Sequence, residues 1–167
     1  MRATVTIIGA ALLALTAVAG TAAASSRAVP RCGTADLTVS LKQAGAAAGT
    51  AYYRIVFRNH TGHACSLTGY PGVSYVAGTA GRQVGPAASR DPGHIRTVVI
   101  PSGRTAHALL READTLNYSK STCQPRHVRG LRVYPPNTRA AVFLPWSHRV
   151  CSKRVGQTGV RPVRRGG

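Results

Sequence analysis

The chain has 167 residues, of which 44% are hydrophobic and 16% are charged. Lys and Arg together number 22, whereas the acids are only Asp36, Asp91, Glu112 and Asp114, so the formal net charge is +18. With only four carboxylates, the chain is a poor candidate for enzymes that need two facing acids, such as glycosidases. The positive charge indicates anionic partners: nucleic acid, anionic cell-wall polymer or acidic lipid surfaces.

Residues 1–24 have the layout of a secretory signal peptide. Met1-Arg2 is a positive start, Val5 to Ala19 is apolar, and Ala22-Ala23-Ala24 offers small residues for cleavage. A membrane anchor is the alternative, but the apolar run is shorter than the roughly 20 residues needed to span a bilayer. We therefore expect a secreted product, extracellular or associated with the cell wall, with no membrane span and a charge of +17 once Arg2 is removed.

Short runs of alternating or β-rich residues follow at spacings of about ten residues. The clearest runs from Thr50 to Arg58, where Tyr53, Ile55 and Phe57 share one face and Arg54 the other. The small-residue stretch Gln43–Gly49 is interpreted as a hairpin loop, and Pro145 is expected to end the strand before it. The predicted strands are 37–41, 50–58, 65–67, 73–76, 82–84, 97–100, 104–110, 128–133, 140–144 and 160–163.

The stretch from Cys65 to Val76 combines a cysteine with a tight corner. Pro71 fixes its φ angle, and Gly72 is expected to adopt the left-handed conformation that the turn needs. We expect this corner to be structural, with Val73 to Val76 entering the sheet.

Many short strands with Gly and Pro turns, and no long helical periodicity, predict an all-β fold, an antiparallel β-sandwich of the immunoglobulin-like kind. The expected organisation is a flexible leader at residues 25–31, one domain at 32–164 and a frayed C-terminus at 165–167. The sequence leaves the oligomeric state open.

Four cysteines, an even number in an exported chain, predict two disulfides. Three pairings are possible. We favour Cys32–Cys65 and Cys123–Cys151, because each would tie neighbouring strands within one half of the chain. Zinc is the alternative, since His60 and His63 lie near Cys65 and His148 lies near Cys151 in the sequence. The tight Cys-x-x-Cys or His-x-x-x-His pairs of structural zinc sites are absent, so we expect no metal and no cofactor.

The basic residues are mostly single, scattered arginines, with a cluster at Arg161, Arg164 and Arg165 near the end of the chain. This cluster is our candidate contact for a polyanion. The other interpretation is incidental basicity, because a GC-rich genome favours arginine and alanine over lysine. Both interpretations stay open at this point.

Catalytic patterns are missing from the sequence. The closest approach to the Gly-x-Ser-x-Gly of serine hydrolases, at Gly72 to Val76, fails at its last position. Glu112 and Asp114 are the one close acidic pair, and we expect them to bind solvent or arginine. Trp146 is expected to be a core or loop anchor, and the six histidines solvated or packing residues, so we expect no enzyme.

Several strings together resemble a known family: Leu37-Thr-Val-Ser-Leu41, Tyr53 to Asn59, Cys65 to Ser74, Leu131 to Pro136, and Cys151-Ser152. The chain resembles the domain of unknown function 4232 family, found in exported and surface proteins of high-GC Gram-positive bacteria. The resemblance implies a secreted, disulfide-bonded β-sandwich and implies no activity.

Our leading hypothesis is a non-catalytic binding or surface-interaction module held electrostatically to anionic cell-wall polymer. The alternatives are a secreted enzyme or inhibitor with a site built from loops, and an extracellular nucleic-acid binder.

Overall fold

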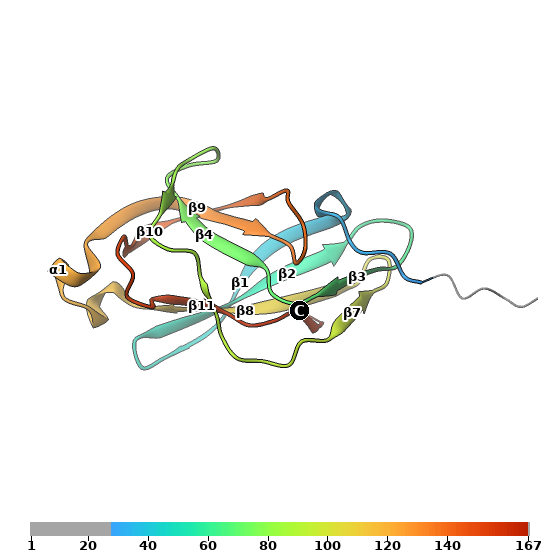
Figure 1. The fold of residues 1–167 in the computed structure, drawn as a ribbon, viewed down its shortest axis with the longest axis horizontal. Helices are drawn as coiled ribbons and strands as arrows, with labels where there is room; N and C mark the ends of the chain where they lie inside the picture. Colours follow the sequence, from blue (N-terminus) through green and yellow to red (C-terminus); the bar gives the residue numbers. More distant parts are fainter. Residues whose placement is uncertain (1–27, 167) are drawn as a thin grey trace, which may run out of the picture.

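The computed structural model describes residues 28–166 and shows a nearly all-β protein whose two main sheets pack face to face (Figure 1). The predicted signal peptide at 1–24 and residues 25–27 of the predicted leader lie outside the described residues. The helical segments are single turns: η1 (Thr34–Asp36), η2 (Thr115–Asn117) and α1 (Lys120–Cys123). The predicted antiparallel β-sandwich is confirmed. In this part of the chain, no helix has the length and apolar character needed to cross a membrane.

The larger sheet has six strands in the order β1-β2-β8-β11-β6, with β12 also paired to β8. All of its pairs are antiparallel except β11–β6. Directly paired residues in an antiparallel sheet point to the same side, so the register decides which side chains share a face. The strands are β1 (Leu37–Ala47), β2 (Thr50–Asn59), β6 (Ser89–Arg90), β8 (Thr105–Ala113), β11 (Thr158–Val160) and β12 (Arg164–Arg165).

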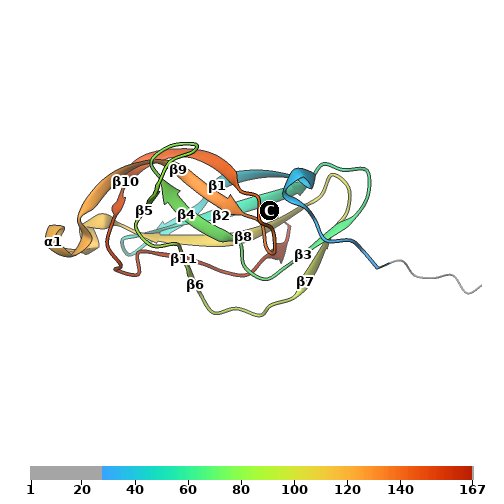
Figure 2. The same ribbon diagram turned by 45° about the horizontal axis from the view of Figure 1, so that its top comes forward.

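The second sheet has four strands in the order β10-β9-β4-β5. They are β4 (Gly72–Val76), β5 (Gln83–Val84), β9 (Pro125–Tyr134) and β10 (Val142–Cys151). A two-stranded sheet of β3 (Cys65–Thr68) and β7 (Thr97–Ile100) lies at one end of the molecule, and α1 lies at the other (Figure 2).

The core lies between the two main sheets. Alternation along each strand directs Ile55, Phe57 and Leu110 inward from the larger sheet and Leu131 and Val133 inward from the smaller one, and all five are fully buried. Each buried side chain of this size stabilises the fold by about 1.5–3 kcal/mol relative to an exposed one.

Two disulfides join Cys32 to Cys65 and Cys123 to Cys151, the pairs favoured from the sequence. The first attaches the N-terminal segment to β3, and the second attaches α1 to the end of β10. All four cysteines are buried. Each disulfide therefore lies inside the protein and joins segments at one end of the sandwich.

The predicted hairpin loop at Gln43–Gly49 is wrong in its extent. Residues 43–47 stay paired with β2 through a bulge between Gln43 and Gly45, and the turn is only Ala48-Gly49. Both turn residues have positive φ, 47° and 69°, as two-residue hairpin turns require. Because this part of β1 is exposed along its whole length, its sequence shows no alternation from which a strand could be predicted.

The predicted end of a strand at Pro145 is also wrong. β10 continues to Cys151, with a register shift between Pro145 and His148. Proline is tolerated here because β10 is the edge strand of its sheet and a bulge absorbs the missing hydrogen bond.

The corner after β3 is present, but a different glycine makes it. Gly69 has φ 97°, whereas Gly72 is the first residue of β4 and is not left-handed. The Gly69 carbonyl accepts a hydrogen bond from the Val163 N–H at 2.9 Å, so the corner is tied to the C-terminal segment.

At both ends of the described part of the chain, more residues are hydrogen-bonded to the domain than the sequence predicts. The leader was predicted to be flexible through residue 31, yet the Pro30 carbonyl accepts a hydrogen bond from the Ser66 N–H at 2.8 Å and Arg31 bridges to Ser66. The frayed end predicted at 165–167 is wrong for Arg165 and Gly166. Arg165 pairs with Ala106 in β12, and the Gly166 N–H donates to the Thr105 carbonyl at 3.1 Å, because β8 offers a free edge there.

Candidate functional site

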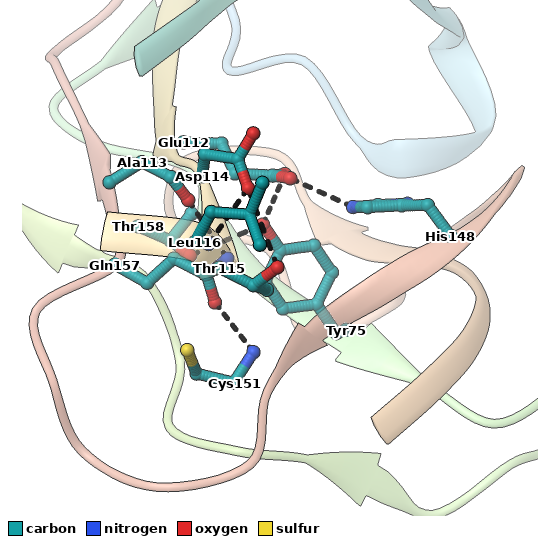
Figure 3. Close-up of polar contacts among 10 residues, drawn as sticks. All are labelled: Tyr75, Glu112, Ala113, Asp114, Thr115, Leu116, His148, Cys151, Gln157 and Thr158. Atoms are coloured by element: carbon teal, nitrogen blue, oxygen red, sulfur yellow. Dashed lines mark hydrogen bonds and ion pairs between the residues drawn. The ribbon is translucent and has the colours of Figure 1, made fainter. Parts of the chain in front are cut away.

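A carboxylate is buried between the two main sheets. Glu112 of β8 is 8% exposed and accepts hydrogen bonds on both oxygens: the Tyr75 hydroxyl donates to one, and His148 Nε2 lies 2.9 Å from the other (Figure 3). Thr158 donates to the Tyr75 hydroxyl at 3.2 Å. Tyr75 and His148 belong to the smaller sheet and Glu112 and Thr158 to the larger, so this buried polar cluster links the sheets.

Aromatic rings surround the cluster. The ring centroids of Trp146 and His148 are 4.1 Å apart, and Tyr53 meets Trp146 edge to face at 4.6 Å. Trp146 packs against the core, as expected for an anchor. Packing between these rings restricts the movement of the side chains, so it keeps Tyr75 and His148 in position beside Glu112.

This environment raises the pKa of the Tyr75 phenol well above its ordinary value. Burial is the main cause, followed by the Glu112 charge and the hydrogen bond to Glu112. The pKa of Tyr53 is raised in the same direction, again chiefly by burial and then by Glu112. Both tyrosines therefore stay neutral over the physiological pH range, and Tyr75 acts as a hydrogen-bond donor.

We expect the raised pKa of Tyr75 to make the protein lose stability above about pH 10. The unfolded chain would ionise this phenol there while the folded protein keeps it protonated. This contribution to stability is therefore complete below pH 10 and falls by about 1.4 kcal/mol per pH unit above it. Absorbance at 295 nm should show Tyr75 ionising only as the protein unfolds. A Tyr75→Phe variant should have a shallower decline, and equal slopes for both proteins would contradict the assignment.

An open pocket of about 480 Å³ lies beside the cluster, and Tyr53, Glu112, Asp114, His148 and Arg149 contribute to its lining. The tip of the β1–β2 hairpin forms its opposite wall.

The polar groups around this pocket differ in what they contact. Nδ1 of His148, the nitrogen that would act as a base, is shielded from solvent and has no partner among the described residues. Asp114 caps η2 by accepting the Leu116 N–H at 2.9 Å, and Glu112 is already engaged on both oxygens.

The expectation that Glu112 and Asp114 bind solvent or arginine is wrong for Glu112, whose partners are a tyrosine and a histidine. The signal was present in the sequence. Ala108 and Leu110 face inward on β8, and continuing this alternation by two residues places Glu112 inside. The role of His148 was missed because the predicted strand ended at Pro145.

The remaining acids are also engaged. Asp91 forms a two-point ion pair with Arg111, at 2.7 and 3.0 Å, and these bonds raise the pKa of the guanidinium. Gly159 permits the close approach, because a Cβ at this position would overlap the Asp91 carboxylate. Asp36 accepts the Gly33 N–H at 2.7 Å.

As a consequence, most of the positive charge has no acidic partner. Within residues 28–166, Arg111 is the only Lys or Arg in an ion pair with a carboxylate. The structure separates the three arginines of the candidate polyanion contact. Arg161 and Arg164 lie on the outer face of the larger sheet, whereas Arg165 pairs with the inward-facing Ala106 and lines another groove together with Arg104.

Histidines and cysteines do not converge on a metal site. Over the described residues, no group of three or more His, Cys, Asp or Glu side chains is arranged to hold an ion. All four cysteines are in disulfides. His60 lies 3.2 Å from the Thr38 hydroxyl, and His107 lies 2.7 Å from the Gly166 carbonyl.

Comparison with known proteins gives a match to a family model. No curated protein and no solved structure gives a significant match. The model of the family described as "Domain of unknown function (DUF4232)" matches residues 32–164, which include both disulfides, the buried polar cluster and nearly all of both sheets. The chain belongs to this family, the domain of unknown function DUF4232.

Proposed function

We propose that this chain is a secreted, non-catalytic binding module that is held to anionic cell-wall polymer by its positive charge. The observation that supports the proposal is that the chain has many more cationic side chains than carboxylates to pair with them. A net charge of +18 goes together with four acids that are all engaged in local hydrogen bonds or ion pairs.

The physical argument concerns the field around the protein. Unpaired cations of one sign generate a long-range attraction for polyanions, and this attraction is screened within about 8–10 Å at physiological salt. The signal-like N-terminus and the disulfides favour a location outside the cell, where anionic wall polymer is the abundant polyanion. The same positive charge would also attract nucleic acid, so the experiment must separate these partners.

We expect the protein to be retained on immobilised inorganic polyphosphate and on purified Gram-positive cell walls at low salt, and to be released as salt rises. The logarithm of the binding constant should fall linearly with the logarithm of salt concentration. Absence of retention at low salt, or retention that does not change with salt, would contradict the proposal. Displacement by DNA at much lower phosphate concentration than by polyphosphate would favour the nucleic-acid binder instead.

A second candidate is the binding of a small ligand in the pocket beside Glu112 and His148. A specific observation favours it, since a carboxylate, an imidazole and Tyr53 meet at one opening. Trp146, the single tryptophan of the chain, packs on this cluster and would report binding there. In the same experiment, a saturable change in Trp146 fluorescence with neutral wall oligosaccharides, independent of salt, would favour this function over the electrostatic one.

A further inference from the structure

We infer that the polymer binds one defined surface, the outer face of the six-stranded sheet, and that its chemical class is a flexible, linear phosphate polymer. This inference rests on the proposed function and gives it a site and a ligand chemistry. We call the surface the outer basic face and define it by six side chains: Lys42, Arg54, Arg58, His107, Arg161 and Arg164.

The register of the sheet aligns three cations in one row. Lys42 of β1 is directly opposite Arg54 of β2, and Arg54 is opposite Leu109 of β8. The Arg161 N–H donates to the Leu109 carbonyl at 2.9 Å, which places Arg161 next in the same row. Neighbouring strands are about 4.8 Å apart, so the row is roughly 14 Å long.

These side chains point away from the core. The residues that alternate with them, Leu41, Ile55 and Leu110, pack against or within the core. Lys42, Arg54 and Arg161 are all exposed. Like charges directly opposite each other destabilise a sheet, so the Lys42–Arg54 pair carries a cost that a bound anion would remove.

A second group of basic side chains lies beside this row. Arg164 is opposite His107, and His107 is opposite Val56, which places both one row further along the sheet. Arg58 is two residues beyond Val56 on β2 and is exposed. Val56 itself is 3% exposed although it does not belong to the core cluster, as expected if the long side chains around it cover it.

Asp91, an acid that lies on this face, is already paired. Asp91 is held by the two-point ion pair with Arg111, so it opposes the cations only weakly. A shallow hollow of about 150 Å³ lies there, lined by Tyr52, Asp91, Leu109, Arg111 and Arg161. The face therefore offers a surface on which basic side chains predominate, with a small recess beside Arg161.

The chemistry of the face favours phosphate. Most of its cations are arginines, whose planar, forked donors match phosphate oxygens at two points. The positive area extends roughly 14 Å both across the strands and from Arg54 to Arg58, which suits a chain of phosphates better than a single anion. Nucleic acid is a weaker fit, because single strands usually stack on several rings of one sheet. Among the residues that the β2–β8 register places on this face, only Tyr52 is a tyrosine, phenylalanine or tryptophan.

The test compares two variants that lose the same charge from different parts of the molecule. One carries Lys42→Gln, Arg54→Gln and Arg161→Gln. The control carries Arg126→Gln, Arg129→Gln and Arg139→Gln, which are exposed residues of β9 and of the loop that joins β9 to β10, without carboxylate partners within residues 28–166. Binding to inorganic polyphosphate is measured as a function of salt, with poly-glutamate and single-stranded DNA as alternative probes.

We expect the outer-face variant to lose at least ten-fold in affinity for polyphosphate at low salt and about three units of its salt slope, one for each lost phosphate contact. The control should lose less than about three-fold and less than one unit of slope. A second outer-face variant, Arg58→Gln with Arg164→Gln, should lose about two units of slope. It tests the same face independently if the first variant does not fold. Thermal unfolding of each variant verifies that it is folded.

The outcomes separate the two proposals. Equal losses in the outer-face and control variants would overturn the localised face and leave the proposed function standing. Absence of binding by the unmodified protein would overturn both. Tighter binding of poly-glutamate or of DNA than of polyphosphate, at equal charge, would overturn the phosphate-polymer chemistry.

Discussion

Replacing both Cys32 and Cys65 by alanine is expected to lower the free energy of unfolding by about 3–4 kcal/mol. The disulfide joins residues 33 positions apart and restricts the unfolded chain accordingly. It also holds the N-terminal segment, where the Cys32 N–H donates to the Ser66 carbonyl at 2.9 Å and the Ser66 N–H donates to Pro30. Urea unfolding measures the change, and hydrogen exchange at the Ser66 amide reports whether this segment opens first.

The second disulfide provides the matched comparison. Cys123 and Cys151 are 28 positions apart, so the Cys123→Ala, Cys151→Ala variant should lose a similar amount, slightly less on the chain-entropy argument. It should leave the Ser66 amide protected. An unchanged unfolding midpoint after loss of Cys32 and Cys65 would show that this link does not stabilise the fold.

Replacing Glu112 by alanine is expected to destabilise the protein by about 3 kcal/mol, the largest effect of any single acidic residue in this chain. The change leaves the Tyr75 hydroxyl and His148 Nε2 without their acceptor between the sheets. Glu112→Gln keeps the shape and one acceptor oxygen, so its cost should be about 1–2 kcal/mol. Chemical denaturation of the three proteins provides the comparison.

Asp114→Ala is the control, because Asp114 is exposed and serves as the cap of η2. Its loss should cost about 1 kcal/mol or less. A Glu112→Ala variant no less stable than Asp114→Ala would mean that the buried polar cluster does not hold the sheets together. A folded Glu112→Ala variant should still bind polyphosphate, since the outer basic face lies on the other side of the sheet.

Local patterns in the sequence were sufficient to predict most of the strands. The alternation of Tyr53, Ile55 and Phe57 identified the inward face of β2, since a strand with one buried face shows a period of two residues. Residues 43–47 could not be predicted as a strand in this way, because both faces of the hairpin are exposed there and apolar and polar residues do not alternate. The prediction was interrupted at Pro145, where an edge position and a bulge tolerate a residue that usually ends a strand.

The candidate sites were harder to predict than the strands, because they are formed by residues that are distant in the sequence. The run Arg161 to Arg165 looked like one basic cluster, but pairing with β8 places Arg161 and Arg164 on the outer face and Arg165 beside Arg104. Lys42 and Arg54 are twelve residues apart in the sequence, and only the β1–β2 register makes them neighbours.

The sequence by itself determined the fold class, the family resemblance and the excess of positive charge, because each depends on composition or on short-range patterns. The tertiary structure alone decided which charges are neutralised and which are not. Asp91 meets Arg111 across 20 positions and Glu112 meets His148 across 36, so pairing follows from sheet topology rather than from spacing along the chain. The tertiary structure therefore distinguishes a generally basic chain from one with an unpaired row of cations on one sheet.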